Sequence, residues 1–196
     1  MKIAIVKYNA GNITSVDYAL RRLGVEPIIT DDEHELKSAD KVIFPGVGEA
    51  KTTMQYLSDK KLDQLIVNLK QPVLGICLGL QLMCQHSQEG DTKCLGIFPI
   101  EVKKFQPTSK IVKVPHMGWN ALRDLDSPLF KGIDEKSFVY FVHSYYAELS
   151  EYTIAECEYL KRFSAALHRD NFYATQFHPE KSADVGSKIL ENFIAL

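Results

Sequence analysis

The first half of the chain alternates short apolar runs with segments of helical periodicity. Four runs are almost wholly apolar, as expected for strands that are buried on both faces of a parallel sheet. They are residues 3–6, 27–29, 42–44 and 73–76. Apolar residues at helical spacing predict one helix over about 16–23, which Gly24 ends, and a second over about 62–69. Strands that alternate with helices in this way indicate a parallel sheet with both faces covered.

The pattern changes after about Gly90. Short segments rich in aromatic and β-branched residues, joined by turn-rich stretches, predict antiparallel strands added to the parallel core. These segments are residues 97–102, 137–142, 153–155 and 172–177. A last helix is expected near the C-terminus, where Val185, Ile189, Leu190 and Phe193 share one face.

Composition narrows the class of protein. The 196 residues are 45% hydrophobic and 24% charged, which is enough to bury one core, so we expect a single domain over residues 1–196. The chain has 23 basic and 25 acidic residues, a formal net charge of -2. This balance gives no electrostatic support to a nucleic-acid partner or an anionic membrane. The acidic stretch 31–35 is interpreted as a solvated loop or a first helical turn.

The chain is expected to be cytoplasmic and reduced. It begins Met-Lys-Ile-Ala-Ile-Val-Lys, a strand pattern and not a signal peptide, and no apolar run approaches the ~18 residues of a membrane span. The four cysteines are Cys77, Cys84, Cys94 and Cys157. They lack C-x-x-C spacing, which argues against a zinc site and against a disulfide framework. No metal and no organic cofactor is expected.

The stretch Gly75-Ile76-Cys77-Leu78-Gly79 is the first candidate for chemistry. It follows an apolar strand, and ligands gather at the carboxyl ends of parallel strands. The two glycines permit a sharp strand-to-helix turn that lifts the Cys77 side chain, as in the nucleophile elbow of hydrolases. A helix N-terminus at this point favours a thiolate. Taken alone, the motif fits a buried structural cysteine equally well.

A thiol nucleophile also needs a base and a group that orients the base. Three of the six histidines lie in polar surroundings and are expected at the surface: His34, His86 and His168. His178 instead follows an apolar strand, and Pro179 interrupts regular pairing so that Glu180 can turn back toward the imidazole. His178 and Glu180 are therefore candidates for base and orienting carboxylate. An exposed His-Pro turn is the alternative.

Residues 75–83 (GICLGLQLM) and 175–182 (TQFHPEKS) together resemble the class I glutamine amidotransferases, and the resemblance covers essentially the whole chain. It implies a three-layer, flavodoxin-like α/β fold with a parallel sheet core and antiparallel additions. It also implies an enzyme that releases ammonia from the amide of glutamine. In that family the cysteine, here Cys77, forms a glutamyl thioester, the histidine, here His178, protonates the departing ammonia, and Glu180 matches the third member of the triad.

An oxyanion forms when the thiolate attacks, and it needs preorganised N–H donors. The N–H of Leu78, directly after the nucleophile, is one candidate. The peptide at Val47, in the segment Pro45-Gly46-Val47-Gly48, is the other. Two glycines around Val47 would let this peptide reorient and so switch the oxyanion hole on and off. The alternative is an ordinary Pro-Gly turn.

The resemblance also assigns positions that bind glutamine. Gln81 lies one helical turn after the nucleophile, and residues 143–145 match the segment that holds the amino and carboxylate groups of glutamine. The expected set is Gly46, Gly48, Gln81, His143, Ser144 and Tyr145. Cys84, seven residues after Cys77, is expected in the core.

Residues 116–120 (HMGWN) discriminate best among subtypes, and they resemble the glutaminase subunits of imidazole glycerol phosphate synthases. This resemblance implies a heterodimer with a separate (βα)8 cyclase chain. Ammonia would pass through the cyclase, which forms imidazole glycerol phosphate and aminoimidazole-carboxamide ribotide in histidine biosynthesis. The positions expected near that interface are Asn12, Met117, Trp119, Tyr140 and Lys181. From composition alone, the single tryptophan is expected in the core.

One segment departs from the subtype's pattern. Lys7 and Asn9 stand where an aspartate and a glycine are common, in the loop after the first strand.

Three alternatives remain open at this point. A glutaminase for pyridoxal phosphate or anthranilate synthesis is the nearest, and residues 116–120 weigh against it. A cysteine peptidase or esterase would cleave acyl substrates that lack the amino and carboxylate groups of glutamine. A non-catalytic binding subunit would have no need of an intact Cys77, His178 and Glu180.

Overall fold

The central sheet of the computed structural model, which describes residues 1–8, 11–107 and 112–196, has seven strands. They are β1 (Ile3–Val6), β2 (Ile28–Thr30), β3 (Lys41–Phe44), β4 (Val73–Ile76), β11 (Thr153–Tyr159), β12 (Lys161–Arg169) and β13 (Phe172–Thr175). Their order is β11-β12-β13-β4-β3-β1-β2. The five strands from β13 to β2 are parallel, and β12 and β11 extend the sheet in antiparallel fashion. The predicted parallel core with antiparallel additions is confirmed, but the segment 172–177, expected among the antiparallel additions, forms β13, which pairs with β4 in parallel.

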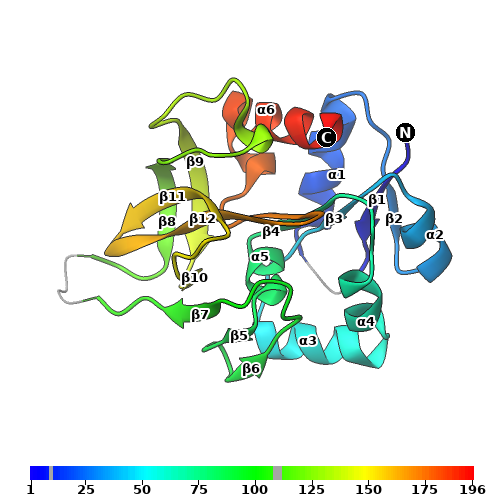
Figure 1. Ribbon diagram of the computed structural model, residues 1–196, viewed down its shortest axis with the longest axis horizontal. Helices are drawn as coiled ribbons and strands as arrows, with labels where there is room; N and C mark the ends of the chain where they lie inside the picture. Colours follow the sequence, from blue (N-terminus) through cyan, green and yellow to red (C-terminus); the bar gives the residue numbers. More distant parts are fainter. Residues whose placement is uncertain (9–10, 108–111) are drawn as a thin grey trace.

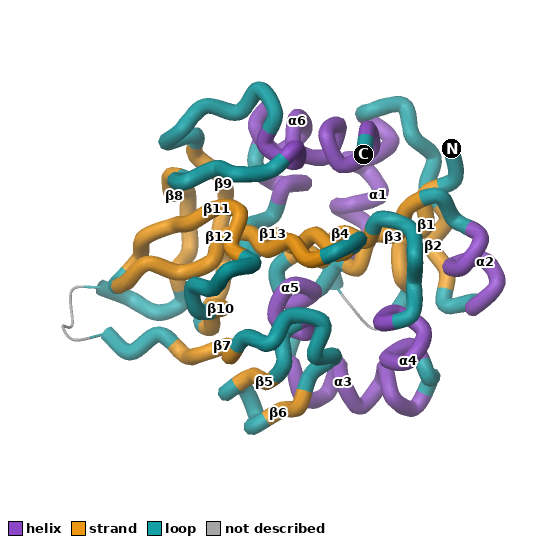
Figure 2. Tube along the Cα trace, in the orientation of Figure 1, coloured by secondary structure: helices purple, strands orange, loops and turns teal. Residues whose placement is uncertain are grey.

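Helices cover both faces of this sheet and make three layers (Figures 1 and 2). They are α1 (Ile13–Arg22), α2 (Glu33–Ser38), α3 (Ala50–Asp59), α4 (Leu62–Val67), α5 (Leu78–Met83) and α6 (Ala183–Ala195), with the short 3-10 helices η1 (Pro128–Phe130) and η2 (Pro179–Lys181). Helices α1 and α6 lie on one face, and α3, α4 and α5 on the other. Each face has its own buried cluster of apolar side chains. No helix among the described residues is long and apolar enough to cross a membrane.

Two smaller sheets stand beside the antiparallel end of the central sheet. One contains β5 (His86–Ser87), β6 (Thr92–Lys93), β7 (Glu101–Lys104) and β10 (Tyr145–Ala147), in the order β10-β7-β5-β6. The other pairs β8 (His116–Ala121) with β9 (Phe138–His143) in antiparallel register. Figure 1 shows β7, β10 and the β8–β9 pair on the side of the molecule where β11 and β12 lie, while β5 and β6 lie below α5, next to α3.

Several elements differ from the sequence prediction. The strand expected over 97–102 begins only at Glu101, because the preceding residues bind the end of α5, where the N–H of Phe98 donates to the carbonyl of Met83 at 2.9 Å. The acidic stretch 31–35, by contrast, forms the expected first helical turn: it leads into α2, and the carboxylate of the capping residue Asp32 accepts the N–H of Glu35 at 2.8 Å. Helix α3 and strand β12 were not predicted.

Candidate active site

Cys77 lies at a sharp turn between β4 and α5. Its backbone adopts φ 54° and ψ -105°. This conformation is energetically unfavourable for any residue other than glycine, and it recurs at functional sites. Gly79 lets α5 approach β3, because a Cβ at this position would lie 2.1 Å from the carbonyl oxygen of Phe44. The predicted strand–turn–helix around Cys77 is confirmed.

His178 and Glu180 form a buried pair directly after β13. Nδ1 of His178 lies 2.8 Å from Oε1 of Glu180, and both side chains are fully buried. Burial opposes protonation of the imidazole, but the neighbouring Cys77 thiolate and the Glu180 carboxylate outweigh it and raise the pKa of His178. Because Glu180 occupies Nδ1, a proton exchanged with Cys77 must pass through Nε2. That nitrogen is buried and has no hydrogen-bond partner among the described residues.

Asn12 belongs to this buried group and not to an exposed surface. Its Nδ2 donates to Oε1 of Glu180 and lies 3.2 Å from Nδ1 of His178. Asn12 is 3% exposed, because it precedes the first residue of α1 and this helix end packs against η2, which contains Glu180. Its side chain therefore holds the carboxylate of Glu180, and the expectation that Asn12 lies near the partner interface stays a prediction. Lys7 is exposed, and Asn9 lies outside the described residues.

A cavity of about 320 Å³ opens in front of Cys77, which is within the range of small-molecule sites. Its lining comes from the ends of β3 and β4, from the turn after β5 and from the end of β9. The lining residues are Val47, Gly48, Cys77, Leu78, Gln81, Glu89, Pro115, Val142, His143, Ser144 and Tyr145. All residues expected to bind glutamine are in this set except Gly46. Gly46 is buried against the hydroxyl of Tyr8 and the start of α5.

The predicted oxyanion hole is not formed in this conformation. The N–H of Leu78 donates to the carbonyl of Gly46 at 3.3 Å. That carbonyl and the N–H of Val47 belong to one planar trans peptide and therefore point in opposite directions. While the carbonyl faces Leu78, the Val47 N–H is turned away from it. One rotation of this peptide, about ψ of Gly46 and φ of Val47, would free the first donor and bring in the second, and Gly46 has no Cβ to hinder it.

His143 lines the cavity, but its ring is engaged within the protein. Nδ1 lies 2.7 Å from the carbonyl of Tyr145, and Nε2 lies 3.0 Å from Nδ1 of His116. The two histidines are 5% and 3% exposed. Burial lowers the pKa of His143 to about 3 and that of His116 to about 4. Both ring nitrogens of His143 thus have partners within the described chain, and the expectation that residues 143–145 hold the amino and carboxylate groups of glutamine stays a prediction.

The two neutral histidines give a prediction about stability and pH. Their pKa values are lower in the folded protein than the ordinary 6.5 of an unfolded chain. As the pH falls below 6.5, the unfolded chain takes up protons that the folded protein excludes, so the free energy of unfolding falls. Each histidine contributes up to about 1.4 kcal/mol per pH unit. Chemical denaturation between pH 6.5 and 5 measures the slope. The slope should become shallower in His116→Phe than in the wild-type chain, and equal slopes in the two proteins would contradict the prediction.

Sequence reasoning missed Glu89, a carboxylate on the cavity wall. Its Oε2 accepts the N–H of Ala50, at the start of α3, at 2.8 Å. Burial and the nearby Glu49 raise the pKa of Glu89, while the bond from Ala50 opposes them. Its position twelve residues after Cys77 carried no motif, so only the fold reveals it.

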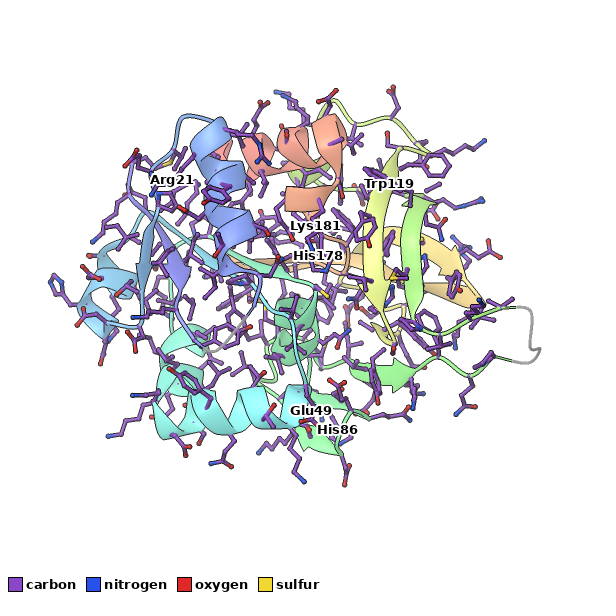
Figure 3. The ribbon with its side chains drawn as sticks, turned by 180° about the vertical axis from the view of Figure 1, so that it is seen from behind. Arg21, Glu49, His86, Trp119, His178 and Lys181 are labelled. Carbon is purple, nitrogen blue, oxygen red and sulfur yellow. The ribbon has the colours of Figure 1, made fainter. Side chains whose placement is uncertain are left out.

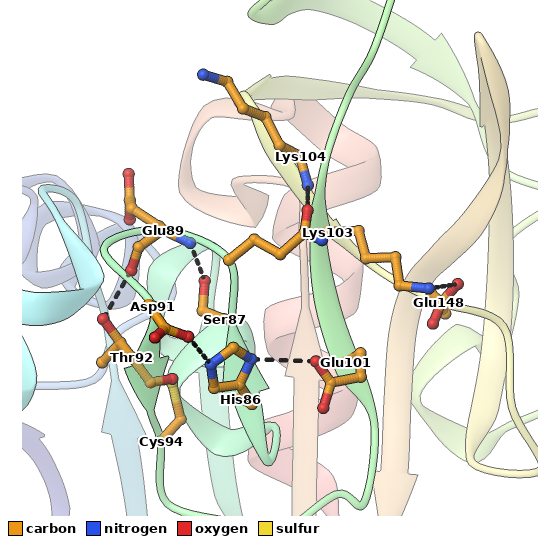
Figure 4. Close-up of polar contacts among 11 residues, drawn as sticks. His86, Ser87, Glu89, Asp91, Thr92, Cys94, Glu101, Lys103, Lys104 and Glu148 are labelled. Carbon is orange, nitrogen blue, oxygen red and sulfur yellow. Dashed lines mark hydrogen bonds and ion pairs between the residues drawn. The ribbon is translucent and has the colours of Figure 1, made fainter.

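The turn that presents Glu89 is braced by its own side chains (Figure 4). Ser87 Oγ accepts the N–H of Glu89 at 3.1 Å, and Thr92 Oγ1 donates to its carbonyl at 2.6 Å. His86 lies between two carboxylates, 2.9 Å from Asp91 and 3.1 Å from Glu101, and these two carboxylates raise its pKa. The turn therefore holds Glu89 at the cavity without help from a ligand.

Four of the residues expected at the partner interface gather on one side of the site. We call this group the β8–β9 patch; it consists of Met117, Trp119, Tyr140 and Lys181. Met117 is 67% exposed and Trp119 is 52% exposed, so the composition-based expectation of a core tryptophan was wrong. The rings of Trp119 and Tyr140 meet edge to face, with centroids 6.1 Å apart. Figure 3 shows Lys181 beside His178, with Trp119 on the neighbouring strand pair.

The β8–β9 patch is bonded to the backbone of the triad. The N–H of His178 donates to the carbonyl of Tyr140 at 2.9 Å, and the N–H of Tyr140 donates to Oγ of Ser182 at 2.9 Å.

Cys84 is fully buried, as expected. Within the described part of the chain, no group of three or more histidine, cysteine, aspartate or glutamate side chains is arranged to hold a metal ion.

Comparisons with known proteins agree on one family. Residues 4–196 match the family described as Glutamine amidotransferase class-I. A protein of Bacteroides fragilis (strain YCH46), named imidazole glycerol phosphate synthase subunit HisH, is 63% identical over 100% of both chains. A protein of the same name from Bacteroides thetaiotaomicron is 62% identical, again over 100% of both chains. Among solved structures, PurLQS from Thermotoga maritima has a TM-score of 0.71 at 15% identity, covering 99% of this chain and 97% of that one, which supports the fold alone.

Proposed function

Because the chain belongs to the class I glutamine amidotransferase family, we propose that it is the glutaminase subunit of an imidazole glycerol phosphate synthase. The two Bacteroides relatives that bear this name match it over their full lengths. The match to the family over residues 4–196 supports treating the chain as a single glutamine amidotransferase domain. An alternative glutaminase, for pyridoxal phosphate or anthranilate synthesis, has no comparable support.

One observation carries the chemical part of the proposal: Cys77 stands on a strained elbow at a cavity, and the buried His178–Glu180 pair is near enough for Cys77 to raise the pKa of His178. In the proposed reaction the Cys77 thiolate attacks the carboxamide carbon of glutamine. His178, protonated and held by Glu180, gives its proton to the departing ammonia. Water, deprotonated by His178, then hydrolyses the glutamyl thioester and releases glutamate.

The cavity supplies complementary groups for an amino acid. The Glu89 carboxylate is the only acidic side chain among the lining residues of the described chain, and it can pair with the ammonium group of glutamine. Ser144 and the backbone around it offer hydrogen-bond donors and acceptors for the carboxylate. Nε2 of Gln81 is held by the carbonyl of Tyr145 at 2.9 Å, so the carbonyl end of its amide is the end left for the substrate. A peptidase or esterase would have no use for this polar set.

The proposed partner is a separate (βα)8 cyclase chain that binds the β8–β9 patch and receives the ammonia. Exposed large aromatic side chains favour protein interfaces, and this patch is bonded directly to the His178 segment. A partner seated here would thus close the site on the side where ammonia leaves. A cytoplasmic location forms part of the same proposal, with the four cysteines all present as free thiols.

The test is glutamate release from glutamine by the purified chain, measured alone and with a (βα)8 cyclase and its nucleotide ligand. The proposal expects slow release by the lone chain and strong stimulation by the complex. Release that the cyclase does not change would support membership of the glutamine amidotransferase family but contradict the assignment to imidazole glycerol phosphate synthase. Absence of glutamate under every condition would favour a non-catalytic subunit.

Trp119→Ala is expected to weaken binding of the cyclase chain. Loss of a large aromatic anchor typically costs about 2 kcal/mol or more, which is about 30-fold in affinity. Titration calorimetry of each variant with the cyclase measures the change. Leu149→Ala is the matched control, because Leu149 is 43% exposed and lies outside the β8–β9 patch. Equal affinities for the two variants would remove Trp119 from the interface.

A further inference from the structure

A continuous path of hydrogen bonds connects β8 with Cys77. Nδ2 of Asn120 lies 3.2 Å from Nε2 of His116, and Nδ1 of His116 lies 3.0 Å from Nε2 of His143. Nδ1 of His143 lies 2.7 Å from the carbonyl of Tyr145. We call His116 and His143 the histidine pair.

The partners at the two ends determine the proton positions in the histidine pair. A carbonyl only accepts, so Nδ1 of His143 must carry the proton and Nε2 of this ring must accept. His116 therefore donates through Nδ1, and its Nε2 accepts from the amide of Asn120. Both rings are neutral Nδ1–H tautomers. Each proton points in the same direction, from β8 toward Tyr145.

The path continues from Tyr145 to the nucleophile. The carbonyl of Tyr145 also accepts Nε2–H of Gln81 at 2.9 Å. The same amide nitrogen donates to Oε1 of Gln176 at 3.0 Å, and Nε2 of Gln176 lies 3.7 Å from Sγ of Cys77. This arrangement directs an N–H of Gln176 at the sulfur. Gln176 is fully buried, and no motif in the sequence singled it out for this role.

The histidine pair is held rigidly by packing. The ring of His116 stacks between Tyr159, at 4.0 Å and 13°, and Phe141, at 4.8 Å and 23°. The residue next to His116 is Met117, which belongs to the β8–β9 patch. A displacement of β8 at the surface would therefore move His116 as well. Because the imidazole of His116 is tightly stacked, such a movement would change its hydrogen bond to His143.

We propose that His116 and His143 are positioning residues for the glutaminase reaction: the Nδ1–H of His116 fixes the orientation of the His143 ring, and the pair holds the Tyr145 carbonyl that orients Gln81 and Gln176 beside Cys77. The proposal rests on the proposed glutaminase function. It adds a route by which the strand carrying Met117 and Trp119 acts on the nucleophile, separate from the peptide at Val47. Neither histidine touches the reacting atoms through its ring nitrogens.

The experiment compares His116→Phe and His116→Asn with the wild-type chain, each with the cyclase present. Phenylalanine keeps the stacking on Tyr159 but removes the donor to His143, whereas the amide of asparagine can replace the Nδ1–H donor. In His116→Phe, kcat for glutamine should fall about 10- to 100-fold, because the nucleophile and Gln81 lose alignment, with a smaller change in KM. His116→Asn should recover most of that loss. A wild-type kcat in His116→Phe overturns the proposal.

A second readout does not depend on catalysis. Nitrogen-15 spectra of the imidazoles in the wild-type chain should show His116 and His143 as neutral Nδ1–H tautomers, and an Nε2–H tautomer at either ring overturns the proposal. His168→Phe is the matched control, since His168 stacks on Tyr173 at 4.1 Å and 13° without joining the path; its kcat should equal that of the wild type. If the wild-type complex releases no glutamate, the proposed function fails. The tautomers of His116 and His143 still test the hydrogen-bond path, because their measurement does not depend on catalysis.

Discussion

Cys77→Ala is expected to lower glutamate release, alone and with the cyclase, by at least about 10⁴-fold, because Cys77 is the one thiol among the described residues that line the cavity. Alanine can occupy the same backbone position with a smaller side chain, so the elbow should be kept. The rate of glutamate formation by the complex measures the effect. The cyclase half of the reaction should still proceed in this variant when ammonia is added directly, since added ammonia bypasses the missing step.

Two controls separate chemistry from folding. Cys157→Ala removes a cysteine that is fully buried in β11, outside the cavity, and should keep glutamate release. Binding of the cyclase by Cys77→Ala, measured by calorimetry, should match the wild type. Glutamate release by Cys77→Ala within about tenfold of the wild-type rate would rule out Cys77 as the nucleophile.

Val47→Pro is expected to remove most of the stimulation by the cyclase. Proline has no backbone N–H, so this variant deletes the donor that a rotated Gly46–Val47 peptide would offer to the oxyanion. Loss of one such donor typically costs about 10²–10³ in rate, and stimulation of the wild type should be of this order. Glutamate release with and without the liganded cyclase gives the stimulation factor.

Val47→Ala is the matched control, because it shortens the side chain and keeps the N–H. It should retain strong stimulation. Equal stimulation in the proline and alanine variants would mean that the Val47 N–H does not serve the oxyanion. In the isolated chain the Leu78 N–H is bound to the Gly46 carbonyl. Brisk hydrolysis by the wild-type chain alone would therefore contradict the idea that the Gly46–Val47 peptide must rotate to form the oxyanion hole.

Much of the fold follows from local patterns. The apolar runs that became β1, β3 and β4 are buried throughout. Strands that are buried on both faces consist of continuous apolar residues, which makes them easy to recognise in a sequence. Strand β12 was missed because its centre is Ser-Ala-Ala, residues with weak strand preference. It forms because β11 and β13 supply hydrogen-bond partners on both sides, and the local sequence contains no trace of that pairing.

By itself, the sequence determined the chemistry of the site: a cysteine between two glycines after a buried strand, and a histidine and glutamate separated by one proline. These are short-range features, so the residues that make them are neighbours in the chain. Only the tertiary structure decided which distant side chains complete the site. It placed Asn12 on Glu180, Glu89 on the cavity wall and Gln176 against the sulfur. Such contacts join segments up to 168 residues apart, and they depend on how the sheet is ordered, which no local pattern records.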